Sequence, residues 1–270
     1  MPEPQHSQRF LHRTEAPELI EAATQVAGFD LGKRPEFAFA ANVSGVRNRT
    51  FTFSRRRDSR TIFAGDTRYG IAGKAGAWQG GDREVIGALR GALKAAGVPS
   101  KEVVGVNVLS EFGAAGEVVD GEVRAEQPTL LRKIGAARRA VEQLPVWSSY
   151  AKVGLTADGR VGWLELHWPV VGPEVLKEAH LLRSLVERGF PVPDVRGARL
   201  QSVEAGVLHS PAIGFFMDVT PAARAVFAPE DPEMGRLATL YVDRHGEFVD
   251  LPRDIRPAKP DDRKREASAD

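Results

Sequence analysis

The feature that most constrains the fold of this chain is a series of glycine-containing turns between short β-rich segments. Asp-Gly occurs at residues 120–121 and 158–159, and Asp243 and Gly246 bound a third turn. Asp-Gly between β-rich segments favours a hairpin, because both residues tolerate the positive φ of a tight turn. We therefore expect several antiparallel hairpins along the chain.

Three segments have the apolar spacing of amphipathic helices. They span residues 82–96, 128–141 and 173–188, and the first and third stop at Gly97 and Gly189. The first two are each followed by β-rich segments that contain an Asp-Gly turn, so a helix-then-hairpin unit is repeated. This order predicts an α+β fold with helices packed on one face of antiparallel sheets.

The repeat also suggests a division of the chain. We expect an N-terminal extension at 1–34, a first α+β module at 35–127, a second at 128–252 and a disordered tail at 253–270. The tail is charged and almost free of large apolar side chains, so burial cannot offset its ordering entropy. A single continuous domain remains an alternative to two modules.

Composition excludes several classes of protein. The chain has no cysteine, which rules out disulfides, thiolate metal sites and thiol catalysis. The 37 Lys and Arg residues nearly balance the 36 Asp and Glu residues, so no global field attracts nucleic acid. A local basic run from Arg55 to Arg60 keeps phosphate binding as a minor alternative to a solvated loop.

No motif for a cofactor or metal is found. The glycine-rich loop from Tyr69 to Gly76 departs from a phosphate-binding loop at Arg68 and Ala75. We therefore expect no cofactor and no metal site. The first ten residues lack a secretory signal and no apolar run is long enough to cross a bilayer, which predicts a cytoplasmic protein without membrane contact.

The segment from Trp163 to Trp168 alternates polar and apolar side chains. On a strand, Trp163, Glu165 and His167 point to one face, with Glu165 and His167 about 6.6 Å apart along the chain. A carboxylate beside an imidazole suits acid/base chemistry, because the carboxylate orients the ring. The simpler interpretation is a partly solvated sheet face on which Trp163 packs.

A second polar group lies in an apolar segment. His209 and Asp218 are surrounded by leucine, isoleucine, phenylalanine and methionine, and buried polar groups need hydrogen-bond partners. They are either a general base with its partner or a satisfied core histidine with a turn or cap residue. Glu165, His167, His209 and Asp218 are thus the candidate catalytic residues, and Trp147, Tyr150 and Trp163 the candidate ligand-binding residues.

Residues 137–147 and 150–161 resemble the peptidase-propeptide modules of the PepSY and fungalysin/thermolysin-propeptide type. The likeness rests on Pro145-Val146, the strand Tyr150-Ala151-Lys152-Val153-Gly154-Leu155 and the turn from Asp158 to Val161. It implies a cystatin-like helix-on-sheet module that binds a partner and has no catalytic residues of its own.

These observations lead to two hypotheses of function. The first is a non-catalytic module that binds a protein or small molecule on an antiparallel sheet face. The alternative is a small cofactor-free enzyme, such as a cyclase, isomerase or dehydratase, with a pocket between helix and sheet. Such enzymes use few polar groups in an apolar cavity, so missing motifs do not decide between the two.

Overall fold

The computed structural model describes residues 5–39, 43–56, 60–67, 80–113, 116–119, 122–125, 127–211, 217–230 and 237–250. The chain divides into two compact units. Unit 1 contains Met1–Arg139 and Ser149–Val170, and unit 2 contains Ala140–Ser148 and Val171–Asp270. Each unit is described separately below.

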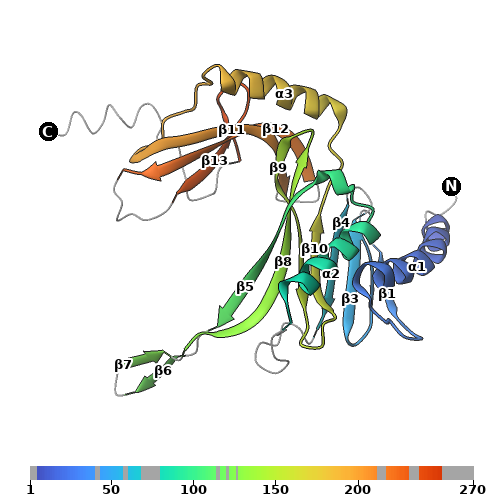
Figure 1. The fold of residues 1–270 in the computed structure, drawn as a ribbon. Coiled ribbons are helices and arrows are strands. Elements are labelled where there is room, and N and C mark those ends of the chain that lie inside the picture. The colour runs from blue at the N-terminus through green and yellow to red at the C-terminus, as the bar shows by residue number, and fades with distance from the viewer. Residues whose placement is uncertain are drawn as a thin grey trace. The chain divides into compact units, whose positions relative to one another are not determined.

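Unit 1 is built on an antiparallel sheet, seen in Figure 1. Its strands lie in the spatial order β1 (Glu36–Phe39), β2 (Val43–Arg47), β3 (Phe51–Arg56), β4 (Thr61–Asp66), β10 (Val161–His167), β9 (Leu144–Leu155), β8 (Thr129–Val141) and β5 (Val103–Gly113). A separate small hairpin pairs β6 (Gly116–Val119) with β7 (Glu122–Ala125). The last residues of β8 and the first of β9 belong to unit 2.

Two helices cover one face of this sheet, α1 (Gln5–Ala27) and α2 (Asp82–Ala95). The core contains Leu19 and Ala23 of α1, Leu89 and Leu93 of α2, and a set of strand residues, which are Val46, Phe53, Ala64, Ala137, Ala151, Val153, Leu164 and Leu166. The α2 helix has acidic residues in its first turn and stops before Gly97, whose φ of +69° ends the helix. Figure 1 shows both helices lying on the strands of unit 1.

Unit 2 packs one helix, α3 (Pro173–Glu187), against a second group of strands. The start of β9 pairs in parallel with β11 (Ala198–Pro211) at Val146 and Trp147. Antiparallel neighbours follow in the order β12 (Met217–Pro229), β13 (Ala238–Val242) and β14 (Phe248–Asp250). Pro173 occupies the first turn of α3, where its missing N–H costs nothing.

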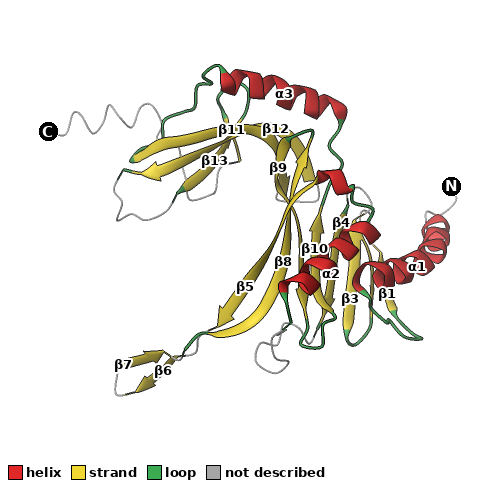
Figure 2. Cartoon of the chain, viewed as in Figure 1, coloured by secondary structure: helices red, strands yellow, loops and turns green. Residues whose placement is uncertain are grey.

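The predicted α+β architecture of helices on sheets, with repeated helix-hairpin units and a cystatin-like module, is wrong. Strands make up 50% and helices 24% of the described residues, which contain three α-helices and one short 3₁₀ helix, η1 (Ser100–Glu102). Figure 2 shows the predominance of strands directly. The helices predicted at 82–96 and 173–188 are confirmed, as are the turns at Asp158-Gly159 and at Asp243 to Gly246.

The repeat fails at residues 128–141, which form the strand β8 instead of a helix. The pattern of Leu130, Ile134, Ala137 and Val141 fits a helix, but the buried residues alternate as Gly135, Ala137 and Arg139. Pairing with β5 along most of its length therefore outweighs helix propensity.

Gly135 allows β8 to pack directly against α2, because a Cβ at this position would lie 3.1 Å from Val85 Cγ1 of α2. The helix and the sheet can approach closely only where β8 has no side chain.

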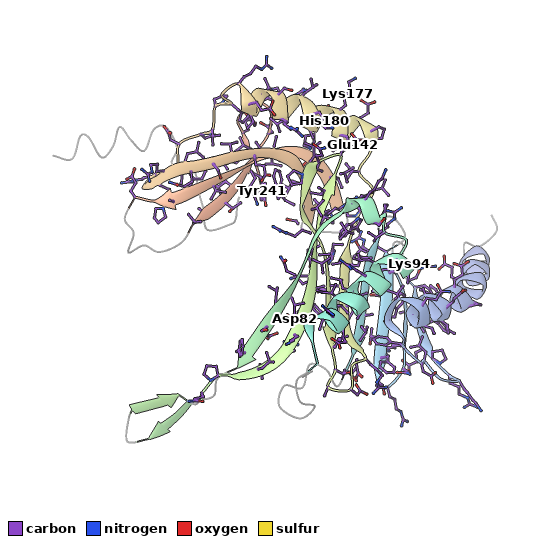
Figure 3. The ribbon with its side chains drawn as sticks, in the orientation of Figure 1. Asp82, Lys94, Glu142, Lys177, His180 and Tyr241 are labelled. Atoms are coloured by element: carbon purple, nitrogen blue, oxygen red, sulfur yellow. The ribbon has the colours of Figure 1, made fainter. Side chains whose placement is uncertain are left out.

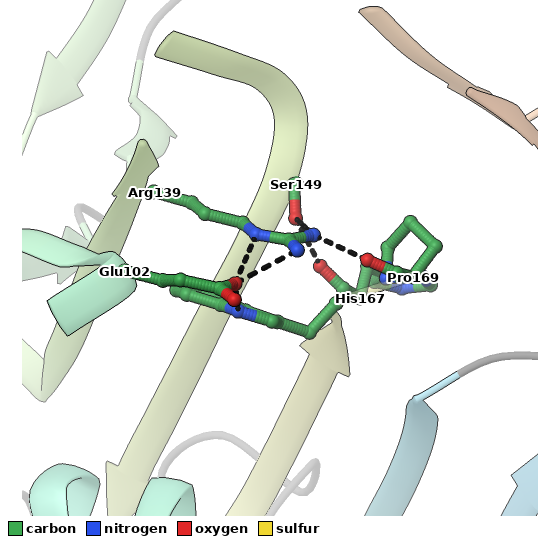
Figure 4. Close-up of polar contacts among 6 residues, drawn as sticks. Glu102, Arg139, Ser149, His167 and Pro169 are labelled. Carbon is green, nitrogen blue, oxygen red and sulfur yellow. Dashed lines mark hydrogen bonds and ion pairs between the residues drawn. The ribbon is translucent and has the colours of Figure 1, made fainter. Parts of the chain in front are cut away.

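A charged residue lies inside unit 1, held by a group that we call the Arg139 network (Figure 4). The Arg139 guanidinium donates to Glu102 Oε2 from Nε at 2.9 Å, and Nη2 lies 2.8 Å from the same oxygen. Arg139 Nη1 donates to Ser149 Oγ at 3.3 Å and to the Pro169 carbonyl at 2.6 Å. Ser149 in turn donates to the His167 carbonyl at 2.7 Å.

Trp168 completes this network. Its indole Nε1 donates to Glu102 Oε2 at 2.9 Å, and the Arg139 guanidinium lies 5.2 Å from the ring centroid. The Arg139 side chain is 1% exposed and that of Glu102 13%. Burial lowers the pKa of Arg139, and the charge of Glu102 opposes that shift. The network ties η1, β8, β9 and the end of β10 together.

Several sequence predictions lie outside the described residues. They are the glycine-rich loop at 69–76, the centre of the basic run at 57–59, the turn at 120–121 and the tail at 253–270. Within the described part of the chain, no helix is both long and apolar enough to cross a membrane.

The Arg139 network yields a prediction of stability. Arg139→Met leaves the Glu102 carboxylate without its ion-pair partner in a largely buried position, so the free energy of unfolding should fall by about 3–5 kcal/mol. Urea denaturation followed by tryptophan fluorescence measures this change.

The matched control is Arg47→Met, which removes the ion pair of Arg47 with Glu36. Those side chains are 67% and 71% exposed, so the loss should be below about 1 kcal/mol. Equal losses for the two variants would contradict a structural role of the Arg139 network.

Candidate functional site

One face of the unit 1 sheet lies opposite the face that α1 and α2 cover. Along β10, Gly162, Leu164 and Leu166 are buried, while the residues between them are only half-buried. Cross-strand pairing places Phe63 and Lys152 beside Glu165, and Tyr150 beside His167. We call this surface the open face; it carries Phe63, Tyr150, Lys152, Trp163, Glu165 and His167.

Tyr150 and Glu165 are joined directly on the open face. The Tyr150 hydroxyl donates to Glu165 Oε2 at 3.2 Å. Burial, followed by the nearby negative charge of Glu165 and by this hydrogen bond, raises the pKa of Tyr150 to about 12. Tyr150 is therefore a neutral hydrogen-bond donor throughout the physiological pH range.

His167 stacks beside the same tyrosine. The ring centroids of Tyr150 and His167 are 4.8 Å apart at an interplanar angle of 52°. Burial lowers the pKa of His167, Glu165 opposes this shift, and Lys152 and Arg56 add to it. The imidazole is therefore neutral at pH 7, the form that can accept a proton.

Lys152 brings a positive charge to this group. Its Nζ lies 4.6 Å from the centroid of the Tyr150 ring, within the range of a cation–π contact. The cluster therefore combines an ammonium, a carboxylate, a phenol and an imidazole on two adjacent strands. Such a set can orient a polar ligand or move a proton between two of its atoms.

A pocket of about 540 Å³ opens on the same surface. Its walls include Phe63, Asp66, Glu111, Arg132, Ile134 and Trp163. Trp163 lies two residues before Glu165 on β10, so the pocket adjoins the polar cluster.

Arg132 binds both carboxylate oxygens of Glu111, from Nε and, at 2.9 Å, from Nη2. The hydrogen bond from Arg132 is the main reason that the pKa of Glu111 is lowered. This ion pair fixes one wall of the pocket opposite the aromatic side chains.

The structure separates the residues singled out from the sequence into two groups. Tyr150, Trp163, Glu165 and His167 share the open face of unit 1. Trp147, His209 and Asp218 belong to unit 2.

Within unit 2, Trp147 is 8% exposed, with its ring 5.5 Å from that of Tyr241 and 5.4 Å from the guanidinium of Arg224. His209 is 1% exposed. Asp218 lies in β12 opposite Ser210, and its side chain is outside the described residues.

Sequence reasoning missed four residues of the candidate site, namely Phe63, Glu111, Arg132 and Lys152. Lys152 could have been predicted from the sequence, because a hairpin centred on Asp158-Gly159 brings it opposite Glu165. Arg132 could not be predicted, because its segment has the apolar spacing of a helix but forms a strand. Phe63 and Glu111 reach the pocket only through pairing of distant strands.

The basic run contributes to the packing of unit 1. Arg55 donates to Glu18 of α1 at 3.1 Å, which holds one of its arginines against the first helix. Among the described residues, no three His, Asp or Glu side chains are placed so that they could hold a metal ion.

No protein-family model matches the chain, and no curated protein matches it. One solved structure, described as an uncharacterized protein from Eubacterium rectale, is similar at 11% sequence identity and a TM-score of 0.42. The match covers 89% of this chain and 82% of that one.

The raised pKa of Tyr150 gives a prediction for alkaline pH. In the unfolded chain Tyr150 ionises near pH 10, whereas in the folded chain it ionises near pH 12. Its contribution to stability is fully present below pH 10 and is lost as pH rises to about 12. Urea denaturation across this range should therefore show a steeper loss of stability for the wild type than for Tyr150→Phe.

Glu165→Gln is the matching variant, because it retains the phenol and removes the charge that helps to raise its pKa. In this variant the phenolate absorbance of Tyr150 should develop at lower pH than in the wild type. An unchanged titration would mean that Glu165 does not act on Tyr150.

Proposed function

We propose that this chain is a non-catalytic binding module that holds a small molecule on the open face of unit 1. The observation that carries the proposal is the 540 Å³ pocket, which places two aromatic side chains opposite a fixed ion pair. Pockets of about 300–1,000 Å³ with mainly apolar walls and a few polar groups are typical ligand sites.

The lining of the pocket favours a planar, mainly apolar ligand with one polar end. Phe63 is 40% exposed and Trp163 half-buried, so both rings offer apolar surface that a ligand would cover. Arg132 of β8 and Glu111 of β5 supply polar groups across the sheet from these rings. Rings of this kind contribute strongly to binding because they bury a large area in a defined geometry.

Nuclear magnetic resonance of the tryptophan indole N–H groups tests this proposal. The probes are fused-ring aromatic compounds, half of them carrying a carboxylate and half an amine. Compounds that bind should shift the Trp163 resonance, assigned with Trp163→Phe. The Trp168 resonance should stay in place, because that indole is 0% exposed and donates to Glu102. If bound compounds left the Trp163 resonance in place, the proposal would be wrong.

Substitutions at the pocket give a quantitative version of this test. Phe63→Ala and Trp163→Ala should each weaken binding of such a compound by about tenfold or more, because each removes aromatic contact area. Phe37→Ala is the control, since Phe37 is 37% exposed in β1 and does not line the pocket. Equal losses at Phe37 and Phe63 would count against a specific site.

A second candidate function is acid/base catalysis without a cofactor. It is favoured by one observation, the hydrogen bond from Tyr150 to Glu165 beside the neutral His167 ring. In such an enzyme, His167 would accept a proton, and the Tyr150 hydroxyl would hold the Glu165 carboxylate in place beside it. Substrate conversion that stops in His167→Ala, with ligand affinity unchanged, would favour catalysis over binding alone.

A further inference from the structure

The strand β5 lies at an edge of the unit 1 sheet. Within the described part of the chain it pairs only with β8. The register is regular from Gly105 to Glu111, between two irregular positions. An edge of this kind presents unpaired backbone N–H and C=O groups to which a further strand can bond.

Between its two irregular positions, this edge lacks the usual protection against pairing. Proteins shield edge strands with lysine, proline or short length, but β5 is 11 residues long and contains neither residue. It exposes Val104, Leu109 and Phe112 by 60%, 51% and 59%. A long edge with exposed apolar side chains is suited to pairing with another strand.

A second pocket, of about 620 Å³, lies between this edge and α2. Leu93, Val98, Val104 and Val106 form apolar walls, and Arg90 and Lys94 contribute two positive charges. Figure 3 labels Lys94 on α2. Arg90 and Lys94 are four residues apart, so they extend from the same side of the helix. Neither forms an ion pair within the part of the chain that is described.

We propose that the β5 edge and this pocket together bind an extended acidic peptide, which adds to the sheet as a further strand. Main-chain hydrogen bonds to β5 supply affinity, and alternate side chains of the peptide supply specificity. On the helix side, an apolar side chain occupies the pocket and a carboxylate lies between Arg90 and Lys94. The site is separate from the open-face pocket of the proposed function.

Charge favours an acidic peptide over a second copy of this chain. The one acidic residue of β5 is Glu111, and Arg132 already binds both of its carboxylate oxygens. Pairing of two β5 strands would therefore bring no free carboxylate to Arg90 and Lys94. A peptide from another protein can supply a carboxylate at one of the positions that face the helix, two residues from an apolar side chain.

Fluorescence anisotropy with the full chain tests this inference. The probes are two labelled peptides as long as the regular stretch of β5, and both carry serine at every second position. At the positions between, which share one face of a strand, valine alternates with glutamate in one peptide and with lysine in the other. The glutamate peptide should bind, more weakly as salt rises, and at least tenfold more tightly than the lysine peptide. Equal binding of both, or no binding of the glutamate peptide, overturns the proposal.

Backbone methylation separates strand addition from simple charge attraction. Two further glutamate peptides carry N-methyl groups on alternate amides, one on the odd and one on the even positions. Because only one edge of an added strand faces β5, one methylated peptide should lose binding and the other retain it. Equal behaviour of the two overturns strand addition.

Charge reversal on α2 locates the peptide. Arg90→Glu and Lys94→Glu combined should weaken the glutamate peptide by about tenfold, whereas Arg83→Glu on the same helix, outside the pocket, should leave binding unchanged. Sedimentation of the free chain completes the test. A dimer that dissociates when the peptide binds would show that a second copy is the natural occupant, and would overturn the proposal.

Discussion

The ion pair between Arg139 and Glu102 is the interaction on which the centre of unit 1 depends. A charged guanidinium inside a protein is costly unless its donors are satisfied, and here a carboxylate, a hydroxyl and a carbonyl accept them. Ser149 extends the network to the carbonyl of His167, whose side chain lies on the open face. The buried network on one side of the sheet thus fixes the backbone that presents the candidate site on the other.

Local signals in the sequence predicted two of the three helices and the main turns. Gly97 and Gly189 have positive φ at the ends of α2 and α3, and Gly159 has it in the β9–β10 turn. Each of these glycines is required by the conformation of its own few residues. The helix ends and turns at these glycines could therefore be predicted from short segments of sequence, without knowledge of the tertiary fold.

The predicted architecture was wrong because the contact that decides it, between Arg139 and Glu102, joins residues that are distant in sequence. Arg139 looks like a solvent-facing residue of an amphipathic helix, and only Glu102, in another segment, makes its burial favourable. Once residues 128–141 form a strand, Arg132 and Ile134 enter the pocket of the open face. The Trp163, Glu165 and His167 alternation was predictable, whereas the wall opposite Trp163 was not. The resemblance to propeptide modules stays a prediction.

Gly135 shows how an absent side chain governs a distant surface. Gly135 of β8 has only a hydrogen atom facing Val85, so α2 can pack close to the sheet. The distance between α2 and the sheet in turn affects the depth of the groove between α2 and β5. A substitution at position 135 would therefore change the depth of that groove without altering any residue that lines it. A methyl group at position 135 would lift the helix, and the spacing between its two basic side chains and the strand edge would change with it.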